Sequence, residues 1–409
     1  MLEIQSKEYK VPLFIKDDLS PILLPSFFSH SLTVNQTIYE LERVVGKKGF
    51  VTQKLVTKQI KREQVVMILG KINNFLSWLD SYSLSSNEVS LESHHNLSNK
   101  ILNFYINEVL VEKLGKSEGV IKKHLTALRA YYNYLANAGF TNIKNIVIEV
   151  NFQERARENT KVRTAVKYIT PELRSILYQN TSSVRDELLL KTAGELGLRT
   201  KENLGILVND FEVGAKIHKG MLSLFKEMRD NPSQNEFKFY LQGKYTKAPR
   251  NGFGEPRYIF FTRELLFRMN EYYEEERPES DSNHFFLNTD TVFYGTPISK
   301  MRASKVFESV REIVIEKQKT LLLPSDGQQL EEDHTHHVLR HSFGTDKFYF
   351  LADAHGMAVD NVTSTSLVYL TVAKLMGHNA ADKHAPQTTK SYIRSCNIKK
   401  DFEEGQQWF

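Results

Sequence analysis

The side chains best suited to chemistry lie between residues 334 and 392. His337 and Arg340 are three residues apart, so on a helix their Cβ atoms lie roughly 5–6 Å apart on one face, and both side chains can reach one anionic group. His378 follows in a Gly-His step, and Tyr392 stands behind two threonines. In this order the stretch supplies a cation, a proton-handling group and a nucleophile, which is a set that suits attack on a phosphodiester.

This ordered set resembles the signature of the tyrosine recombinases, also called phage-type integrases. The family pattern is His-x-x-Arg-His, then Leu-Gly-His, then Thr-Thr-x-x-Tyr. The corresponding residues here are His337-x-x-Arg340-His341, Met376-Gly377-His378 and Thr388-Thr389-x-x-Tyr392. A fourth piece, residues 197–202, resembles the first arginine box of the family, with Arg199 as its arginine. The resemblance rests on four pieces in the family's order.

The resemblance implies a role for each residue. Arg199 and Arg340 would grip the phosphate oxygens, where negative charge accumulates in the transition state. Tyr392 would be the nucleophile, His337 the base, and His378 a hydrogen-bond donor to a nonbridging oxygen. Attack would release a 5′-hydroxyl and leave a 3′-phosphotyrosyl bond.

Three further residues would support this chemistry. Glu202 would orient Arg199, although an exposed ion pair is the alternative role at this spacing. His341 is expected to be a buried, hydrogen-bonded histidine that supports its helix. The leaving oxygen needs a proton, and the resemblance assigns its donor to Lys244, between two predicted strands. Lys247 is close enough in sequence to compete for this role.

No cofactor is expected. The phosphotyrosyl bond keeps the energy of the phosphodiester, and the sequence has no Gly-x-x-x-x-Gly-Lys-Ser/Thr phosphate loop, so ATP has no evident site. A metal site is the alternative for the histidine-rich residues 332–341. A metal would leave Arg199, Arg340 and Tyr392 without roles, so we expect none.

Three functions fit these motifs. The first is a site-specific DNA recombinase or integrase, the second a catalytically silent DNA-binding regulator with a recombinase fold, and the third an enzyme like the type IB topoisomerases. Each position that aligns with the family pattern carries a competent residue, which argues against the silent regulator. The helical region before the motifs and the short tail after Tyr392 favour a recombinase over a topoisomerase.

Length and composition limit the number of domains and the class of protein. A chain of 409 residues predicts two or three domains, and its 41% hydrophobic and 25% charged residues are typical of globular proteins. The net charge of +5 is compatible with a nucleic-acid partner but does not require one. The one cysteine, Cys396, excludes an intramolecular disulfide framework. With no secretory pattern at the start of the sequence, we expect a cytoplasmic, nucleoid-associated protein.

Periodicity and resemblance together predict the domains. The expected divisions are an N-terminal extension at 1–55 that could contact DNA, a helical core-binding (SAM-like) domain at 56–150, a linker at 151–167, and a tyrosine recombinase catalytic domain with a C-terminal tail at 168–409. Helical patterns are predicted at 62–79, 100–114, 117–138, 184–198, 262–276 and 300–319, with another helix starting at Thr170-Pro171. Alternation predicts strands at 236–241 and 257–261. The expected fold class is therefore mainly α with a small β-sheet (α+β), with a helical domain before a mixed α/β one.

Basic residues outside the motifs are candidates for DNA contacts. They are Lys122, Lys123 and Arg129 in the 117–138 pattern, and Arg155, Arg157, Lys161 and Arg163 in the predicted linker. Solvated surface charge accounts for them equally well.

The resemblance also implies partners: double-stranded target sites, a tetramer on DNA, and an accessory DNA-bending protein. The tail ends in Trp408-Phe409 and is expected to dock on an adjacent subunit, with folding onto its own domain as the alternative. Mobile genetic elements are the expected setting of such an enzyme.

Overall fold

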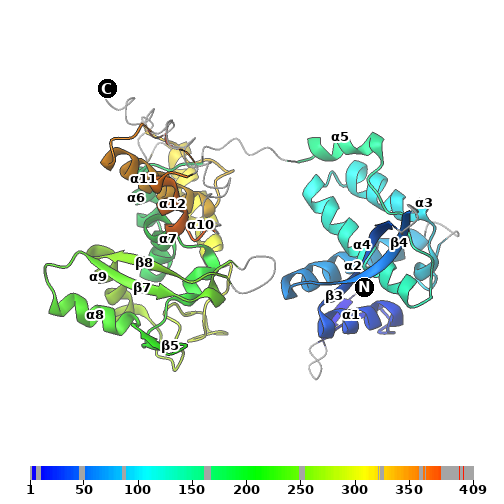
Figure 1. Cartoon of the computed structure of the whole chain (residues 1–409), viewed down its shortest axis with the longest axis horizontal. Helices are drawn as coiled ribbons and strands as arrows, with labels where there is room; N and C mark the ends of the chain where they lie inside the picture. The colour runs from blue at the N-terminus through cyan, green and yellow to red at the C-terminus, as the bar shows by residue number, and fades with distance from the viewer. Residues whose placement is uncertain are drawn as a thin grey trace. The chain divides into compact units, whose positions relative to one another are not determined.

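The structure is a computed structural model (Figure 1). It describes residues 2–5, 11–45, 51–84, 89–160, 167–247, 254–320, 322, 327–358, 363, 365–378, 396 and 399. The chain divides into two compact units, Met1–Val162 and Arg163–Phe409. Within the described ranges, no helix is both long enough and apolar enough to cross a membrane.

The first unit is built around two long helices, α2 (Arg62–Ser83) and α4 (Glu118–Asn137), which pack on each other. Their apolar residues recur at helical spacing and are buried, for example Ile68, Ile72 and Leu128. Between them lie η1 (His94–Asn96), α3 (Asn99–Phe104) and the π-helical segment η2 (Tyr105–Lys113). The periodicity at 62–79 and 117–138 therefore predicted the correct elements.

The N-terminal residues contain more regular structure than the sequence indicated. Strands β1 (Leu2–Gln5) and β2 (Pro12–Ile15) form one antiparallel pair, and β3 (Thr37–Val45) and β4 (Val51–Gln59) form another, with α1 (Leu23–Asn35) between the pairs. Strand β3 packs on α4, where the Asn133 amide donates a hydrogen bond of 2.9 Å to the carbonyl of Tyr39. The β3–β4 ribbon is thus attached to the helical core.

Most of the first half of the expected linker at 151–167 is helical, because residues 150–158 form helix α5 (Val150–Glu158). Ala156 is fully buried, and the helix packs on α4 and η2. The polar, basic composition that indicated a linker belongs to the exposed side of α5. Residues 161–166 lie outside the described ranges.

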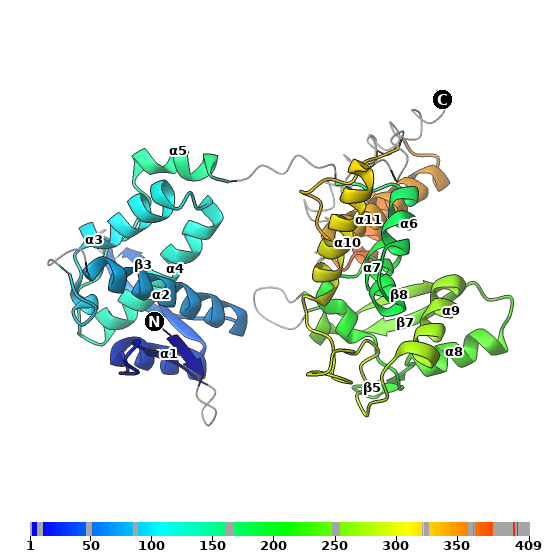
Figure 2. The same ribbon diagram turned by 180° about the vertical axis from the view of Figure 1, so that it is seen from behind.

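In the second unit, α7 (Val184–Leu196) packs against α6 (Pro171–Gln179), α10 (Arg302–Lys319) and α11 (His337–Ala354) (Figure 2). Helix α12 (Leu367–Leu375) packs on α11. The predicted start of α6 is confirmed, since the Thr170 hydroxyl accepts a hydrogen bond of 3.3 Å from the backbone N–H of Leu173. Three consecutive leucines, 188–190, are fully buried because α7 is surrounded by other elements.

The predicted strand pair is also present, as β7 (Glu236–Leu241) and β8 (Arg257–Thr262) in antiparallel register. Beside it lie a second pair, β5 (Phe211–Val213) with β6 (Lys216–His218), and the helices α8 (Met221–Asp230), α9 (Arg263–Glu271) and η5 (Tyr272–Glu276). The expected fold class, mainly α with small antiparallel sheets, is confirmed.

Candidate active site

The end of α7 places the first candidate arginine. The helix stops at Gly197, which has a positive φ of 64°. A Cβ atom there would lie 2.5 Å from the Phe343 ring of α11, so the backbone of α7 and the side chains of α11 approach closely only because residue 197 is glycine. Leu198 is then buried, and Arg199 begins the short helix η3 (Thr200–Gly205).

Glu202 lies at the centre of the site and is completely buried. Its Oε1 accepts a hydrogen bond of 2.8 Å from Nη1 of Arg199, and its Oε2 accepts one of 2.8 Å from the backbone N–H of the same residue. The alternative of an exposed ion pair is therefore wrong for Glu202, because η3 turns the carboxylate into the interior.

Arg340 reaches the same carboxylate from α11. Its guanidinium is 1% exposed, and its Nη1 lies 3.6 Å from Oε2 of Glu202. It also donates hydrogen bonds to the backbone carbonyls of Gly197 and Met376. Arg340 thus joins the end of α7 to the end of α12, and Arg199 and Arg340 share one counterion.

A third arginine, Arg257 at the start of β8, was missed in the sequence. Its Nη1 and Nη2 donate to the two oxygens of Glu202 at 2.9 and 2.8 Å. The alternation of the predicted strand could have identified it. Residues 257, 259 and 261 share one face of β8, and that face is buried, so Arg257 lies on the same side as the apolar core residues. An inward arginine requires a buried acceptor. The sequence could not identify that acceptor, which lies 55 positions away.

Burial raises the pKa of Glu202, but the hydrogen bonds and charge of Arg257, followed by the charges of Arg340 and Arg199, lower it to about 2. The carboxylate is therefore ionised at neutral pH, and three guanidinium groups surround one negative charge. The excess positive charge suits a phosphate group, because guanidinium groups form strong hydrogen bonds to phosphate oxygens.

The candidate histidines experience the same positive charges. Burial first, and then the charges of Arg340 and Arg199, lower the pKa of His378 to about 3. The pKa of His337, on the first turn of α11, is lowered to about 4 by partial removal from water and then by the same two arginines. Both rings are neutral at physiological pH, so each can accept a proton.

His341 lies one helical turn after His337, and the two rings meet edge to face with centroids 4.7 Å apart. Burial, and next the repulsion that a protonated His337 would exert, lower the pKa of His341 to about 3. The neutral His341 ring therefore packs behind His337, which is a position from which it could fix the orientation of that side chain.

The two candidate lysines differ in their surroundings. Lys244 lies in η4 (Gly243–Tyr245), its ammonium group is 4.9 Å from the centre of the Tyr245 ring, and its carbonyl accepts a hydrogen bond of 3.1 Å from Lys201. The charge of Lys247 contributes to lowering the pKa of His337. The field of Lys247 thus reaches a candidate catalytic residue.

Several predicted residues lie outside the described ranges: Thr388, Thr389, Tyr392, Lys161, Arg163, Trp408 and Phe409. Beyond His378 the structure describes Cys396 and Lys399. Cys396 is buried, with its Sγ 3.8 Å from the carbonyl oxygen of Thr345. Lys399 pairs with Asp346 of α11 at 3.0 Å. The described part of the tail thus contacts its own unit.

The candidate DNA-binding residues lie on α4 and α5 of the first unit. Lys122 is exposed and pairs with Glu118 at 2.7 Å, and the side chains of Lys123, Arg155 and Arg157 are also exposed. Arg129 differs, because its Nε and Nη2 both donate to the carbonyl of Ile146. These hydrogen bonds give Arg129 a structural role in holding the chain that follows α4.

The histidine-rich segment gives no metal site among the described residues, where no group of three or more His, Cys, Asp or Glu side chains could hold an ion. His334 and His336 are buried. Nδ1 of His334 accepts a hydrogen bond of 2.9 Å from the backbone N–H of Glu331. These two rings therefore contribute to the packing beneath α11.

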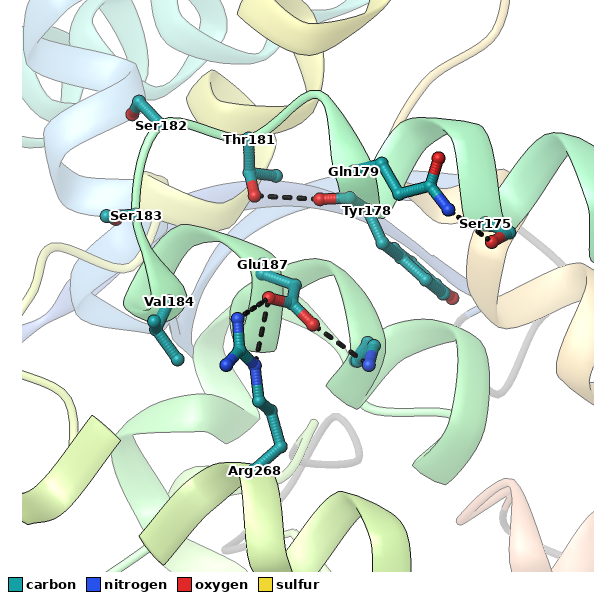
Figure 3. A pocket seen from close by; sticks show the side chains of 10 residues that line it. Ser175, Tyr178, Gln179, Thr181, Ser182, Ser183, Val184, Glu187 and Arg268 are labelled. Carbon is teal, nitrogen blue, oxygen red and sulfur yellow. Dashed lines mark hydrogen bonds and ion pairs between the residues drawn. The ribbon is translucent and has the colours of Figure 1, made fainter. Parts of the chain in front are cut away.

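A cavity of about 570 Å³ opens beside the start of α7 (Figure 3). Its charged side chains are already paired: Glu187 bonds Arg268 at 2.6 Å and Lys191 at 2.9 Å. None of the predicted site residues lines it. The cavity is therefore separate from Arg199, Arg257 and Arg340.

We expect stability to fall as the pH is lowered from about 6.5 to 4, and buried His336 to account for part of this fall. Burial lowers its pKa to about 4, so the unfolded chain binds more protons in this window and stability rises with pH there. The contribution is complete above pH 6.5 and is at most about 3 kcal/mol for one such group. Thermal unfolding of His336→Phe should therefore depend less on pH than that of the wild type. The exposed His355→Gln is the control, and equal slopes for all three proteins would contradict the assignment.

No protein-family model matches the sequence, and no curated protein matches it. Solved structures do match along most of the chain, among them structures of tyrosine recombinases and integrases. An integrase of transposon Tn1549 in complex with circular intermediate DNA is 13% identical, with 83% of this chain and 94% of that chain covered and a TM-score of 0.47. Lambda integrase (residues 75–356) bound to DNA is 14% identical, with 82% and 91% covered and a TM-score of 0.46. XerA recombinase is 13% identical, with 85% of this chain and 93% of that chain covered and a TM-score of 0.34. The likeness is distant, so we infer the function from the site itself.

Proposed function

We propose that this protein is a site-specific DNA recombinase that cuts and rejoins DNA through a 3′-phosphotyrosyl bond, without metal or ATP. The observation that carries the proposal is the pair Arg199 and Arg340, held on one buried carboxylate with His337 and His378 in their field. The four residues come from two sequence motifs and from the step after α12, and the charges of the two arginines act on both neutral histidine rings.

In the proposed reaction, the phenolic oxygen of Tyr392 attacks the phosphorus and the bond from phosphorus to the 5′-oxygen breaks. The phenolic proton passes to neutral His337. The leaving 5′-oxygen takes a proton from Lys247 or Lys244. One phosphodiester is exchanged for another, so a new 5′-hydroxyl can reverse the reaction without an external energy source.

The charge at the site suits this reaction. Negative charge builds up on the nonbridging oxygens during attack, and guanidinium groups stay protonated at any physiological pH. We call Arg199 and Arg340 the arginine clamp. Because Glu202 would hold this clamp in place before the substrate arrives, little reorganisation is needed when the charge develops. His378 would add a hydrogen bond to one of the same oxygens.

We also propose that the two units are functionally distinct. Residues 56–150 would form a core-binding domain, 168–409 the catalytic domain, and 1–55 an additional DNA-contacting element. The exposed basic side chains of α4 and α5 would contact phosphates of double-stranded DNA. A tetramer on DNA, an accessory bending protein, a mobile genetic element as host and a nucleoid location belong to the same proposal.

A strand-exchange assay tests the function against its rivals. Two labelled duplexes carrying the DNA that flanks the gene are incubated with the protein and a chelator. We expect recombinant products and a protein linked to a DNA 3′ end. Relaxation of supercoiled DNA without exchange would indicate the topoisomerase-like enzyme instead. Tight binding with no covalent adduct on nicked sites would indicate a silent regulator.

A further inference from the structure

Glu202 presents an electrostatic problem for the proposed clamp. A buried carboxylate beside Arg199 and Arg340 would cancel much of the positive field that a phosphate needs, and it would compete with the phosphate for their N–H groups. The distances from Glu202 to the surrounding arginines show which of them takes up its charge. Arg257 makes two hydrogen bonds of 2.8–2.9 Å to Glu202, whereas Nη1 of Arg340 stays 3.6 Å away.

The pairing with Arg257 is the most complete of the three. It is bidentate, both partners are buried, and it occupies both oxygens of the carboxylate. Arg199 uses one guanidinium nitrogen and its backbone N–H on the same oxygens, and its side chain is 23% exposed. The geometry leaves the remaining guanidinium nitrogens of Arg199 uncommitted to Glu202.

Arg257 also lies against the turn that carries His378. Gly377 has a positive φ of 56°, and a Cβ atom there would lie 2.5 Å from Nη1 of Arg257. Helix α12 packs on β8, so the backbone beside His378 rests on the Arg257 guanidinium. One side chain therefore touches the counterion of the clamp and the turn that holds a candidate catalytic histidine.

We propose that Arg257 is a positioning residue of the cleavage site, which holds and neutralises Glu202 so that Glu202 orients Arg199 and Arg340 without cancelling their charge. This inference rests on the proposed function for its catalytic consequence. It does not need Arg257 to touch DNA. Without Arg257, Glu202 would draw the two clamp arginines inward, and the site would lose affinity for a phosphate-like anion.

A double-mutant cycle tests the inference with two independent readouts. The variants are Arg257→Gln, Glu202→Gln, the double variant, and Arg257→Lys, which keeps the charge. The matched control is Arg185→Gln, because Arg185 is another buried arginine of the same unit whose carboxylate partner, Asp186, retains a second arginine. The readouts are orthovanadate binding to the full chain without DNA, measured by calorimetry, and the rate of adduct formation on nicked DNA. Thermal unfolding establishes that each variant is folded.

We expect Arg257→Gln to lower the adduct rate by about 10²-fold, comparable to the loss of one charge-stabilising donor, and to weaken vanadate binding. Relative to Arg257→Gln, the double variant should have an adduct rate and a vanadate affinity that are each at least about tenfold higher. The reason is that the unpaired negative charge of Glu202 is no longer present beside Arg199 and Arg340. The adduct rate and vanadate affinity of Arg257→Lys should lie between those of Arg257→Gln and the wild type. Arg185→Gln should lower the melting temperature without changing vanadate binding.

Three results would overturn the inference: a double variant no better than Arg257→Gln, vanadate binding unaffected in Arg257→Gln and Arg257→Lys, or an equal loss in Arg185→Gln. The first would mean that Arg257 contacts the substrate itself. If the vanadate series behaves as expected but the wild type forms no adduct on DNA, the proposed function fails and the positioning role of Arg257 stands. If the wild type binds no vanadate and forms no adduct, both are wrong.

Discussion

Tyr392→Phe is expected to abolish covalent attachment to DNA and to leave DNA binding unchanged. The substitution removes only the phenolic oxygen, which is the atom that would attack the phosphorus. Nicked target DNA traps the adduct, because the released fragment diffuses away and religation cannot occur. A denaturing gel then separates protein-linked DNA from free DNA, and a binding assay on the same site measures affinity.

Tyr369 provides the matched control for this experiment. It is the nearest upstream tyrosine, lies on α12, and is 1% exposed. Burial raises its pKa to about 12, so its hydroxyl is a poor nucleophile. Tyr369→Phe should therefore retain the adduct. An adduct that survives in Tyr392→Phe would remove Tyr392 from the nucleophilic role.

Lys247→Ala is expected to reduce cleavage of ordinary DNA by about 10²- to 10⁴-fold, which is the usual contribution of general acid catalysis. We test Lys247 first because the ammonium group of Lys244 already lies over the Tyr245 ring, and because Lys247 is, after burial, Arg340 and Arg199, among the groups that lower the pKa of His337. A substrate with a 5′-bridging phosphorothiolate has a leaving group that needs no proton. This substrate should restore the rate of Lys247→Ala.

The reciprocal substitution decides between the two lysines. Lys244→Ala should retain most of the cleavage rate on ordinary DNA and gain little from the phosphorothiolate. If instead Lys244→Ala is slow and rescued, the proton donor is Lys244, as the family motif implies. Slow cleavage without rescue in either variant would indicate a role in binding the DNA rather than in protonating the leaving oxygen.

Local signals in the sequence predicted much of the fold. Thr170 and Pro171 marked the start of α6, because a hydroxyl cap and a first-turn proline act within one helical turn. Helical periodicity located α2 and α4, and alternation located β7 and β8. The same reasoning misread α5 as a linker, since its composition is polar except on the one face that Ala156 buries.

The sequence by itself determined which residue types are available for chemistry and in what order, because the motif spacings at 197–202 and 337–341 each act within one or two helical turns. The tertiary structure decided how these residues are combined. Arg257 binds Glu202 across 55 residues, and Arg340 bonds to the carbonyl of Gly197 across 143. Such pairings depend on the packing of α7, α11 and β8 around one buried carboxylate. No local pattern encodes that packing, because the free energy of burying a charge depends on every group that surrounds it.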